Sequence, residues 1–258
     1  QAQLYQACGW STPSFAHIPL IHGADGAKLS KRHGALGVDA YREMGYLPEA
    51  LRNYLLRLGW GHGDAEIIPT EQAIEWFDLA GVGRSASRFD LAKLTNLNAH
   101  YLREMADAEL LPMVLPRIEA AIGGKLDPVG LERITRGLDG VKQRSRTLVE
   151  LADNLVFYAR SGTPPIADDK ARGQLTVEAK TLLAKLAAAL EAEAANWSEK
   201  QVEDAIRRFA ESQGVKLGQV AQPLRVALTG STVSPGIFEV LAILGPAETR
   251  ARLLAASG

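Results

Sequence analysis

The chain has 258 residues, of which 47% are hydrophobic and 23% charged, and its formal net charge is -1. This length predicts one or two domains with a substantial core. The near-neutral charge excludes a histone-like polycation, although a local basic stripe would suffice to bind nucleic acid. The single cysteine, Cys8, excludes an internal disulfide and is typical of a reducing compartment. No signal-peptide pattern and no apolar run of about 18 residues are present, so we expect a cytoplasmic protein without membrane spans.

The first 35 residues differ from the rest of the chain. The opening Gln1 is not an initiator Met, and the residues after it read like the middle of a helix, so we expect a piece of a longer protein. The apolar run 17–23 and the turn residues 24–26 predict one or two strands that lead into a basic loop.

Beyond residue 35 almost every segment is predicted to be helical. Over 47–60, Pro48 suits the first helical position and Gly59 the position past the end. A capping box from Ser198 to Gln201 predicts the start of a second helix. Apolar spacing and cap residues predict helices over 70–81, 148–160, 176–194 and 198–214.

The last part of the chain is predicted to hold two more helices. Over 234–245, Ser234 is the expected cap, Pro235 the first helical residue and Gly245 the stop. A final helix is expected after Pro246. Turn and loop residues predict breaks at 61–69, 123–130 and 161–173, the last as a linker between subdomains.

The basic loop carries groups that suit a polyphosphate. Lys28 and Lys31 lie three residues apart with Ser30 between them, so two ammonium groups and a hydroxyl can reach one phosphate chain. Gly26 and Gly34 would let such a loop move. For an arbitrary string of this kind, a solvated basic turn is the more frequent explanation.

The residues around the loop point to a family. "HIPLIHGADGAKLSKRHGA" resembles the second signature of class I aminoacyl-tRNA synthetases in the form found in glutamyl-tRNA synthetases, with Leu29 for Met and Arg32 for the final Ser. The resemblance extends along the chain through "LYQACGWSTPSFAHIPLI", "LRNYLLRLGWGHGDAEI", "FDLAKLTNLNAHYLRE" and "KLGQVAQPLRVALTGSTVSPGIFEVLAILG". Asn96 departs from the Trp of many members, which affects local packing.

The resemblance implies a mainly α fold with a short β/loop remnant of the catalytic domain at the N-terminus. It implies the end of a nucleotide-binding domain at 1–35, a helical stem-contact domain at 36–105, and anticodon-binding subdomains at 106–165 and 166–258. The family's first signature, H-x-G-H, is missing from this sequence. We therefore expect the C-terminal half of the enzyme, inactive by itself.

The activity that the resemblance implies is ligation of L-glutamate to tRNA-Glu with ATP and Mg²⁺. We expect the full-length enzyme to be a monomer. Family members contact the ATP phosphates through the second Lys of the loop, matched here by Lys31, with Lys28 and Arg32 beside it. The catalytic residues expected on this basis are Lys28, Ser30 and Lys31. The expected partners are tRNA-Glu and the missing N-terminal half, and no cofactor is expected on the fragment itself.

A basic run at 133–148 is the first candidate for tRNA contact. Arginine can stack on an unpaired base and form bidentate hydrogen bonds to its edge. By position along the chain, the resemblance implies Arg144 as an anticodon-reading residue, with Gln143 and Arg146 beside it. Lys142 and Arg146 are predicted to share one helical face. Without the resemblance, a solvated charged helix face is the simpler interpretation.

Two further pairs are candidates for RNA contact. Arg84 and Arg88 lie beside serines and suit phosphate oxygens, although a plain helix-start loop fits equally well. Arg225 and Thr229 are expected near an anticodon base. A helix cap at Ser234 would explain part of that stretch without any ligand.

Other residue types favour structural roles. The five histidines form no pair at metal-ligand spacing, so no metal site is predicted. The four tryptophans are expected in the core or at an interface. Two alternatives stay open: a free-standing tRNA-binding or adaptor module of the same ancestry, and the related glutaminyl enzyme. The helical periodicity speaks against the paired β-barrels that the latter implies.

Overall fold

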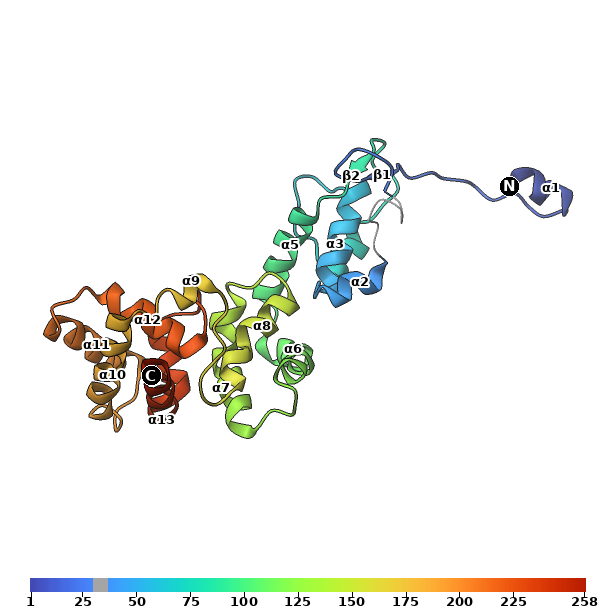
Figure 1. The fold of residues 1–258 in the computed structure, drawn as a ribbon. Coiled ribbons are helices and arrows are strands. Elements are labelled where there is room, and N and C mark those ends of the chain that lie inside the picture. Colours follow the sequence, from blue (N-terminus) through green and yellow to red (C-terminus); the bar gives the residue numbers. More distant parts are fainter. Residues whose placement is uncertain (30–36) are drawn as a thin grey trace. The chain divides into compact units, whose positions relative to one another are not determined.

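The computed structural model describes residues 1–29 and 37–258. Helices make up most of its regular structure, and the described residues hold one small sheet, in which β1 (Ile21–His22) pairs with β2 (Ser87–Arg88) in parallel (Figure 1). The predicted mainly α fold is confirmed. The chain folds as two compact units, Gln1–Asn98 and Ala99–Gly258, which are described separately below.

The first unit is built around a cluster of tyrosines. Its elements are the two strands, α1 (Ala2–Ala7), α2 (Val38–Glu43), α3 (Pro48–Gly59), α4 (Thr70–Trp76) and the first part of α5 (Leu91–Glu104). Tyr41, Tyr46, Tyr54 and Leu94 form the core, and Phe89 packs against it. The Tyr54 hydroxyl accepts a hydrogen bond from the Asp90 amide (2.6 Å) and donates to the Asp90 carbonyl (2.9 Å). These two bonds tie α3 to the start of α5.

The helix predicted over 47–60 is α3, with Pro48 at its start. The loop that follows is held by Asn53, whose side chain is buried. Its Oδ1 accepts from the Ile68 amide (2.9 Å), and its Nδ2 donates to the Glu66 carbonyl (3.2 Å). The buried amide therefore satisfies backbone groups that a loop would otherwise leave without partners.

The helix predicted over 70–81 is shorter than expected. It ends at Trp76, because Phe77 adopts an extended conformation with ψ of 122°. The segment after it turns back, where the Asp78 carboxylate accepts from the Gly81 amide (2.7 Å) and the Asp78 carbonyl accepts from the Trp60 indole (3.1 Å). Packing around Trp60 thus overrides the helical pattern.

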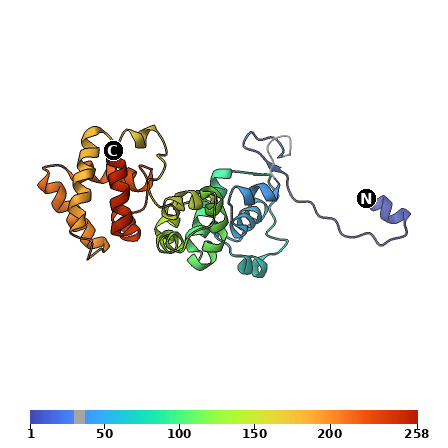
Figure 2. The ribbon, with the colours of Figure 1, turned by 60° about the horizontal axis from the view of Figure 1, so that its bottom comes forward.

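The second unit consists of the remaining helices. They are α6 (Asp107–Ile122), α7 (Pro128–Lys142), α8 (Leu148–Ala159), α9 (Asp169–Arg172), α10 (Val177–Glu191), α11 (Glu199–Ser212), α12 (Leu217–Thr229) and α13 (Ile237–Ser257). Helices α6 and α7 pack on α8, while α10, α11 and α12 pack on α13, which is red in Figure 2. No helix in the described parts of the chain is long and apolar enough to cross a membrane.

Most helix ends in this unit follow the predicted signals. The capping box joins Ser198 and Gln201 at the start of α11. Gly245, with φ of 79°, interrupts the α13 segment, and a new helical run starts at Pro246. The predicted cap at Ser234 is wrong, because the helix has Gly236 as its N-cap and Pro235 lies outside it. A tertiary contact, described below, holds Ser234 instead.

Candidate functional site

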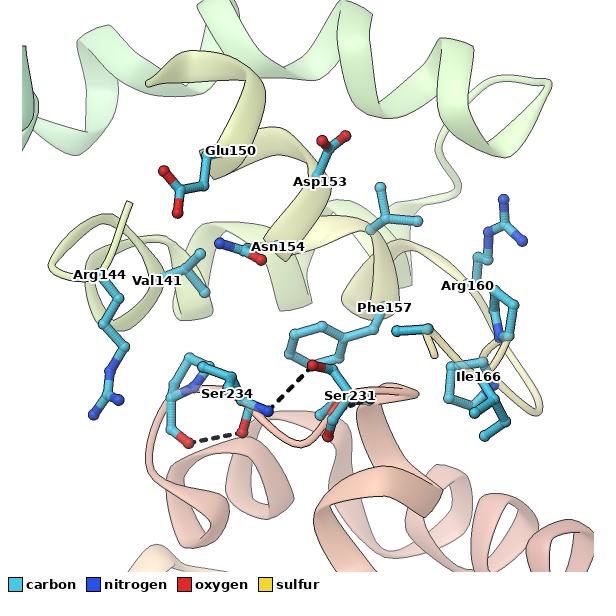
Figure 3. Close-up of a pocket in the computed structure, with 17 residues that line it drawn as sticks. Val141, Arg144, Glu150, Asp153, Asn154, Phe157, Arg160, Ile166, Ser231 and Ser234 are labelled. Atoms are coloured by element: carbon cyan, nitrogen blue, oxygen red, sulfur yellow. Dashed lines mark hydrogen bonds between the residues drawn. The ribbon is translucent and has the colours of Figure 1, made fainter. Parts of the chain in front are cut away.

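The second unit contains a pocket of about 440 Å³ between α8 and the loop that joins α12 to α13 (Figure 3). One wall is a face of α8, where Glu150, Asp153, Asn154 and Phe157 recur at helical spacing. The remaining lining residues come from α8 itself, the end of α7 and the turn after it, the loop after α8, the end of α12 and the loop after α12: Val156, Val141, Arg144, Arg160, Pro164, Pro165, Ile166, Ala167, Thr229, Ser231, Val233, Ser234 and Pro235.

The α12–α13 loop is shaped by Arg225. Its Nη1 donates to the Pro235 carbonyl (2.8 Å), the Ser234 carbonyl (3.2 Å) and the Ser234 hydroxyl. The Thr229 hydroxyl accepts from the Ser231 amide and lies 3.2 Å from it. Side chains of α12 therefore fix the conformation of the loop, which explains why Ser234 is not free to cap α13.

Charges of both signs surround the pocket. Burial lowers the pKa of the Arg225 guanidinium, and the positive charge of Arg144 lowers it further. Burial also raises the pKa of the Glu239 carboxyl, and the negative charges of Glu199 and Asp139 raise it further. The positive charge of Arg144 lowers this pKa. Arg144 therefore contributes positive potential on the side of the pocket where Arg225 holds the loop.

Arg144 is the cationic group most available to a ligand. Its side chain is exposed at one end of the pocket, and it makes no side-chain hydrogen bond or ion pair within the residues that the structure describes. Figure 3 draws Arg144 and Val141 at one end, Arg160 and Ile166 at the other, and the Phe157 ring between them. The site thus combines an apolar surface with a guanidinium donor, an Asn154 amide and the Asp153 carboxylate. Such a combination suits a planar group that carries both donors and acceptors.

The predicted residues around Arg144 have other partners. Lys142 is buried, and its ammonium contacts Asp107 (2.6 Å) and Asp139 (3.5 Å) and donates to the Met105 carbonyl. Gln143 donates to Asp139 (3.3 Å), and Arg146 pairs with Glu150 (3.3 Å). Of the four candidates in the basic run, only Arg144 lines the pocket, and the other three lie outside the lining.

The helical face expected for Lys142 and Arg146 is wrong, because α7 ends at Lys142 and Arg146 lies in the turn before α8. The Lys142 ammonium contacts Asp107 at the start of α6, whereas Arg146 pairs with Glu150 in the first turn of α8, so the two side chains contact different elements. Arg225 and Thr229, by contrast, both contribute to the pocket, the first by holding the loop and the second by lining it.

The N-terminal candidates lie around β1. His22 bridges Lys28 on one side and pairs with Arg88 on the other, so the start of the basic loop and the Arg84–Arg88 segment are neighbours through the backbone. Lys28, Arg84 and Arg88 are exposed. Ser30, Lys31 and Arg32 lie outside the described residues.

Sequence reasoning missed most of the α8 wall. Asp153, Asn154 and Phe157 belong to a helix whose apolar stripe the sequence predicts, and the two polar residues lie at i+3 and i+4 from Glu150, on a face that the stripe does not describe. Their helical spacing was a usable signal. Arg160 and Ser231 had no such signal, because only the packing of distant loops brings them together.

Comparison with known proteins identifies two regions. The family model described as the anticodon binding domain matches residues 89–257, and that of the class I (E and Q) tRNA synthetase catalytic domain matches residues 1–96. The pocket therefore lies entirely within the region of the anticodon binding domain.

Curated relatives and solved structures agree with these matches. Glutamate--tRNA ligase 2 of Rhodospirillum rubrum is 57% identical over 253 residues, which cover 98% of this chain and 54% of the relative. The protein of the same name from Paramagnetospirillum magneticum is 56% identical, over 100% of this chain and 54% of its own. The chain thus spans about half the length of the curated relatives it matches.

Among solved structures, a glutamate tRNA ligase from Elizabethkingia meningosepticum, crystallised in complex with its amino acid, matches with a TM-score of 0.80 at 29% identity. The match covers 99% of this chain and 53% of that one. The resemblance to glutamyl-tRNA synthetases is therefore confirmed, and the chain belongs to this family of class I tRNA synthetases, with the anticodon binding domain over residues 89–257.

Proposed function

We propose that this chain is the tRNA-binding C-terminal portion of a glutamyl-tRNA synthetase, and that the whole enzyme ligates L-glutamate to tRNA-Glu with ATP. The observation that carries the proposal is the pocket within the anticodon binding domain, with its exposed Arg144 next to an apolar surface. The pocket takes one unpaired base of the anticodon loop.

The pocket's chemistry supports this choice of ligand. A base offers a π-face and an edge of donors and acceptors, which aromatic side chains, guanidinium groups and carboxylates recognise in single-stranded loops. Here Phe157 offers a ring, Arg144 a fork of donors, and Asp153 an acceptor. Thr229 lines the same pocket, and Arg225 acts through the loop that it holds.

The rest of the chain would contact the tRNA and the nucleotide. Arg84 and Arg88 are exposed and are assigned to phosphates of the tRNA stem, in a stem-contact domain at 36–105. The two anticodon-binding subdomains are 106–165 and 166–258. Lys28, the described lysine of the basic loop, is exposed and forms no ion pair within the described residues, so it fits a phosphate of ATP. Mg²⁺ would neutralise phosphate charge in the full-length enzyme.

The base-reading role is tested with an RNA hairpin that carries the Glu anticodon loop and with the same hairpin substituted at each anticodon base. Arg144→Ala should weaken binding of the Glu hairpin by roughly tenfold or more and reduce discrimination at one base, since a good bidentate contact discriminates by about 1–3 kcal/mol. Arg207→Ala is the matched control, because it removes the same charge from α11, which contributes no residue to the pocket lining. Equal losses for all hairpins and both variants would reduce Arg144 to a nonspecific charge.

A free-standing adaptor is the competing function. If the chain is a portion of a synthetase, charging of tRNA-Glu should appear when the family's N-terminal half is fused to it or co-expressed with it. A free-standing adaptor would give no charging in that experiment. The chain by itself should not charge tRNA with glutamate and ATP. Robust charging by the isolated chain, or none after the halves are combined, would contradict the proposal.

A further inference from the structure

Arg252 is a fully buried arginine outside the pocket lining. Its Nε donates to Glu248 (2.7 Å), and its Nη1 donates to the Leu228 carbonyl. Its Nη2 donates to the carbonyls of Phe157 (2.9 Å) and Arg160. One side chain of α13 therefore holds backbone groups from two other parts of the unit.

These carbonyls lie at two helix ends. Phe157 is in the last turn of α8, Arg160 is its C-cap, and Leu228 is in the last turn of α12. Carbonyls at the end of a helix have no partner within it and carry a partial negative charge. The Arg252 guanidinium supplies donors and a positive charge to both ends at once. Both helix ends border the pocket, because Phe157 and Thr229 line it.

Glu248 extends this arrangement to the loop after α8. Its Oε1 accepts from the Gly162 amide (2.8 Å), and its Oε2 lies 3.5 Å from Arg133. Farther along the loop, the Ala167 amide donates to the Gly230 carbonyl (2.8 Å). Gly230 has φ of 77°, and a Cβ there would overlap the Pro165 carbonyl oxygen. The loop is thus attached to the rest of the unit at both ends.

The residues between the two attachments form part of the pocket. Pro164, Pro165, Ile166 and Ala167 all line it, opposite the face of α8. Arg252 and Glu248 therefore hold three parts of the pocket boundary in place: the end of α8, the end of α12 and the loop that follows α8.

We propose that Arg252 and Glu248 are positioning residues that set the shape of the pocket and hence its selectivity for one base. This inference rests on the proposed function of the pocket as an anticodon-base site. Buried ion pairs often add little net stability compared with apolar side chains, so a role in geometry accounts for this pair better than a role in stability does. Lysine cannot replace the arginine, because an ammonium group lacks the planar fork that reaches several acceptors.

The test compares Arg252→Lys with Leu183→Ala, both in the full chain. Leu183 is buried in α10 and does not line the pocket, so its truncation supplies a comparable loss of stability at a distance. Temperatures are chosen so that the two variants are equally far below their unfolding midpoints. Binding is measured with the Glu hairpin and with its single-base variants, and amide hydrogen exchange is measured at Gly162 and Ala167.

Arg252→Lys should lower the discrimination ratio between hairpins roughly tenfold and raise exchange at both amides by a similar factor, since one lost hydrogen bond to a charged group has about this effect. Leu183→Ala should change neither. Unchanged exchange and discrimination in Arg252→Lys, or equal changes in Leu183→Ala, would overturn the inference.

The two proposals fail in different ways. If the unmodified chain does not discriminate between hairpins, the base-reading function is wrong whatever Arg252 does. If it discriminates and Arg144→Ala removes the discrimination, while Arg252→Lys leaves it intact, only the positioning role is wrong. Glu248→Gln provides a second variant, which keeps the side-chain shape and should also raise exchange at Gly162.

Discussion

Gly137 of α7 packs directly against the Tyr158 ring of α8, and adding one methyl group there tests the packing behind the pocket. A Cβ at Gly137 would lie 2.8 Å from Cζ of Tyr158 and closer still to Cε2. Carbon atoms pack at about 3.5–4.0 Å, so the Tyr158 ring or the helix must move. Tyr158 is fully buried and its ring lies 4.1 Å from that of Phe157, which leaves little room for such a shift.

The expected size of the effect follows from two opposing contributions. Overpacking of this kind costs about 1–3 kcal/mol, and the short distances argue for the upper half of that range. Replacing Gly by Ala inside a helix recovers about 1 kcal/mol. Gly137→Ala should therefore lower the free energy of unfolding by about 1–2 kcal/mol.

Gly218→Ala is the matched control. Gly218 also lies in a helix, α12, but no atom is within 4 Å of the position of its Cβ. The same substitution should there raise stability by about 0.5–1 kcal/mol. Urea unfolding of the full chain, followed by far-ultraviolet circular dichroism, measures both. If Gly137→Ala stabilised the protein as much as Gly218→Ala does, the close packing of α7 on α8 would be refuted.

Three further predictions concern a buried amide, a carboxyl group and the RNA. Asn53→Ala should cost about 2–3 kcal/mol because it leaves the Ile68 amide and the Glu66 carbonyl without their partner; thermal unfolding should separate it from Asn96→Ala, which changes an exposed residue of α5 and should be nearly neutral. Burial raises the pKa of the Glu239 carboxyl, so the folded chain holds the carboxyl proton more tightly than the unfolded chain does. The stability that this proton contributes is present below a pH of about 4.5 and is lost as the pH rises through the folded pKa. Glu239→Gln should hence stabilise the protein at pH 7 and have little effect below pH 4, and urea midpoints that differ equally at both pH values would contradict this. Affinity for tRNA should fall steeply between about 50 and 200 mM salt, because neutralised phosphates release counterions; an affinity independent of salt would exclude phosphate contacts.

The local features of the helices could be predicted from the sequence. Pro48 at the start of α3, the Ser198–Gln201 capping box and the stop at Gly245 depend on residues within about one helical turn, and a linear sequence contains all of them. The same holds for the mainly α class, since apolar spacing of this kind is set by the period of the helix. The stretches that resemble glutamyl-tRNA synthetases are likewise a property of the sequence alone.

The tertiary structure decided what these elements do together. Ser234 carries a good capping signal, yet Arg225 of α12 holds its hydroxyl and moves the start of α13 to Ile237. The sequence predicts Lys142 as a basic surface residue, yet its side chain is buried and its ammonium contacts Asp107 of α6. The pocket itself joins a face of α8 to loops that are far from it in sequence. Contacts of this kind depend on which helices pack side by side. The spacing of apolar residues and the helix caps are local properties of the sequence and do not determine that packing.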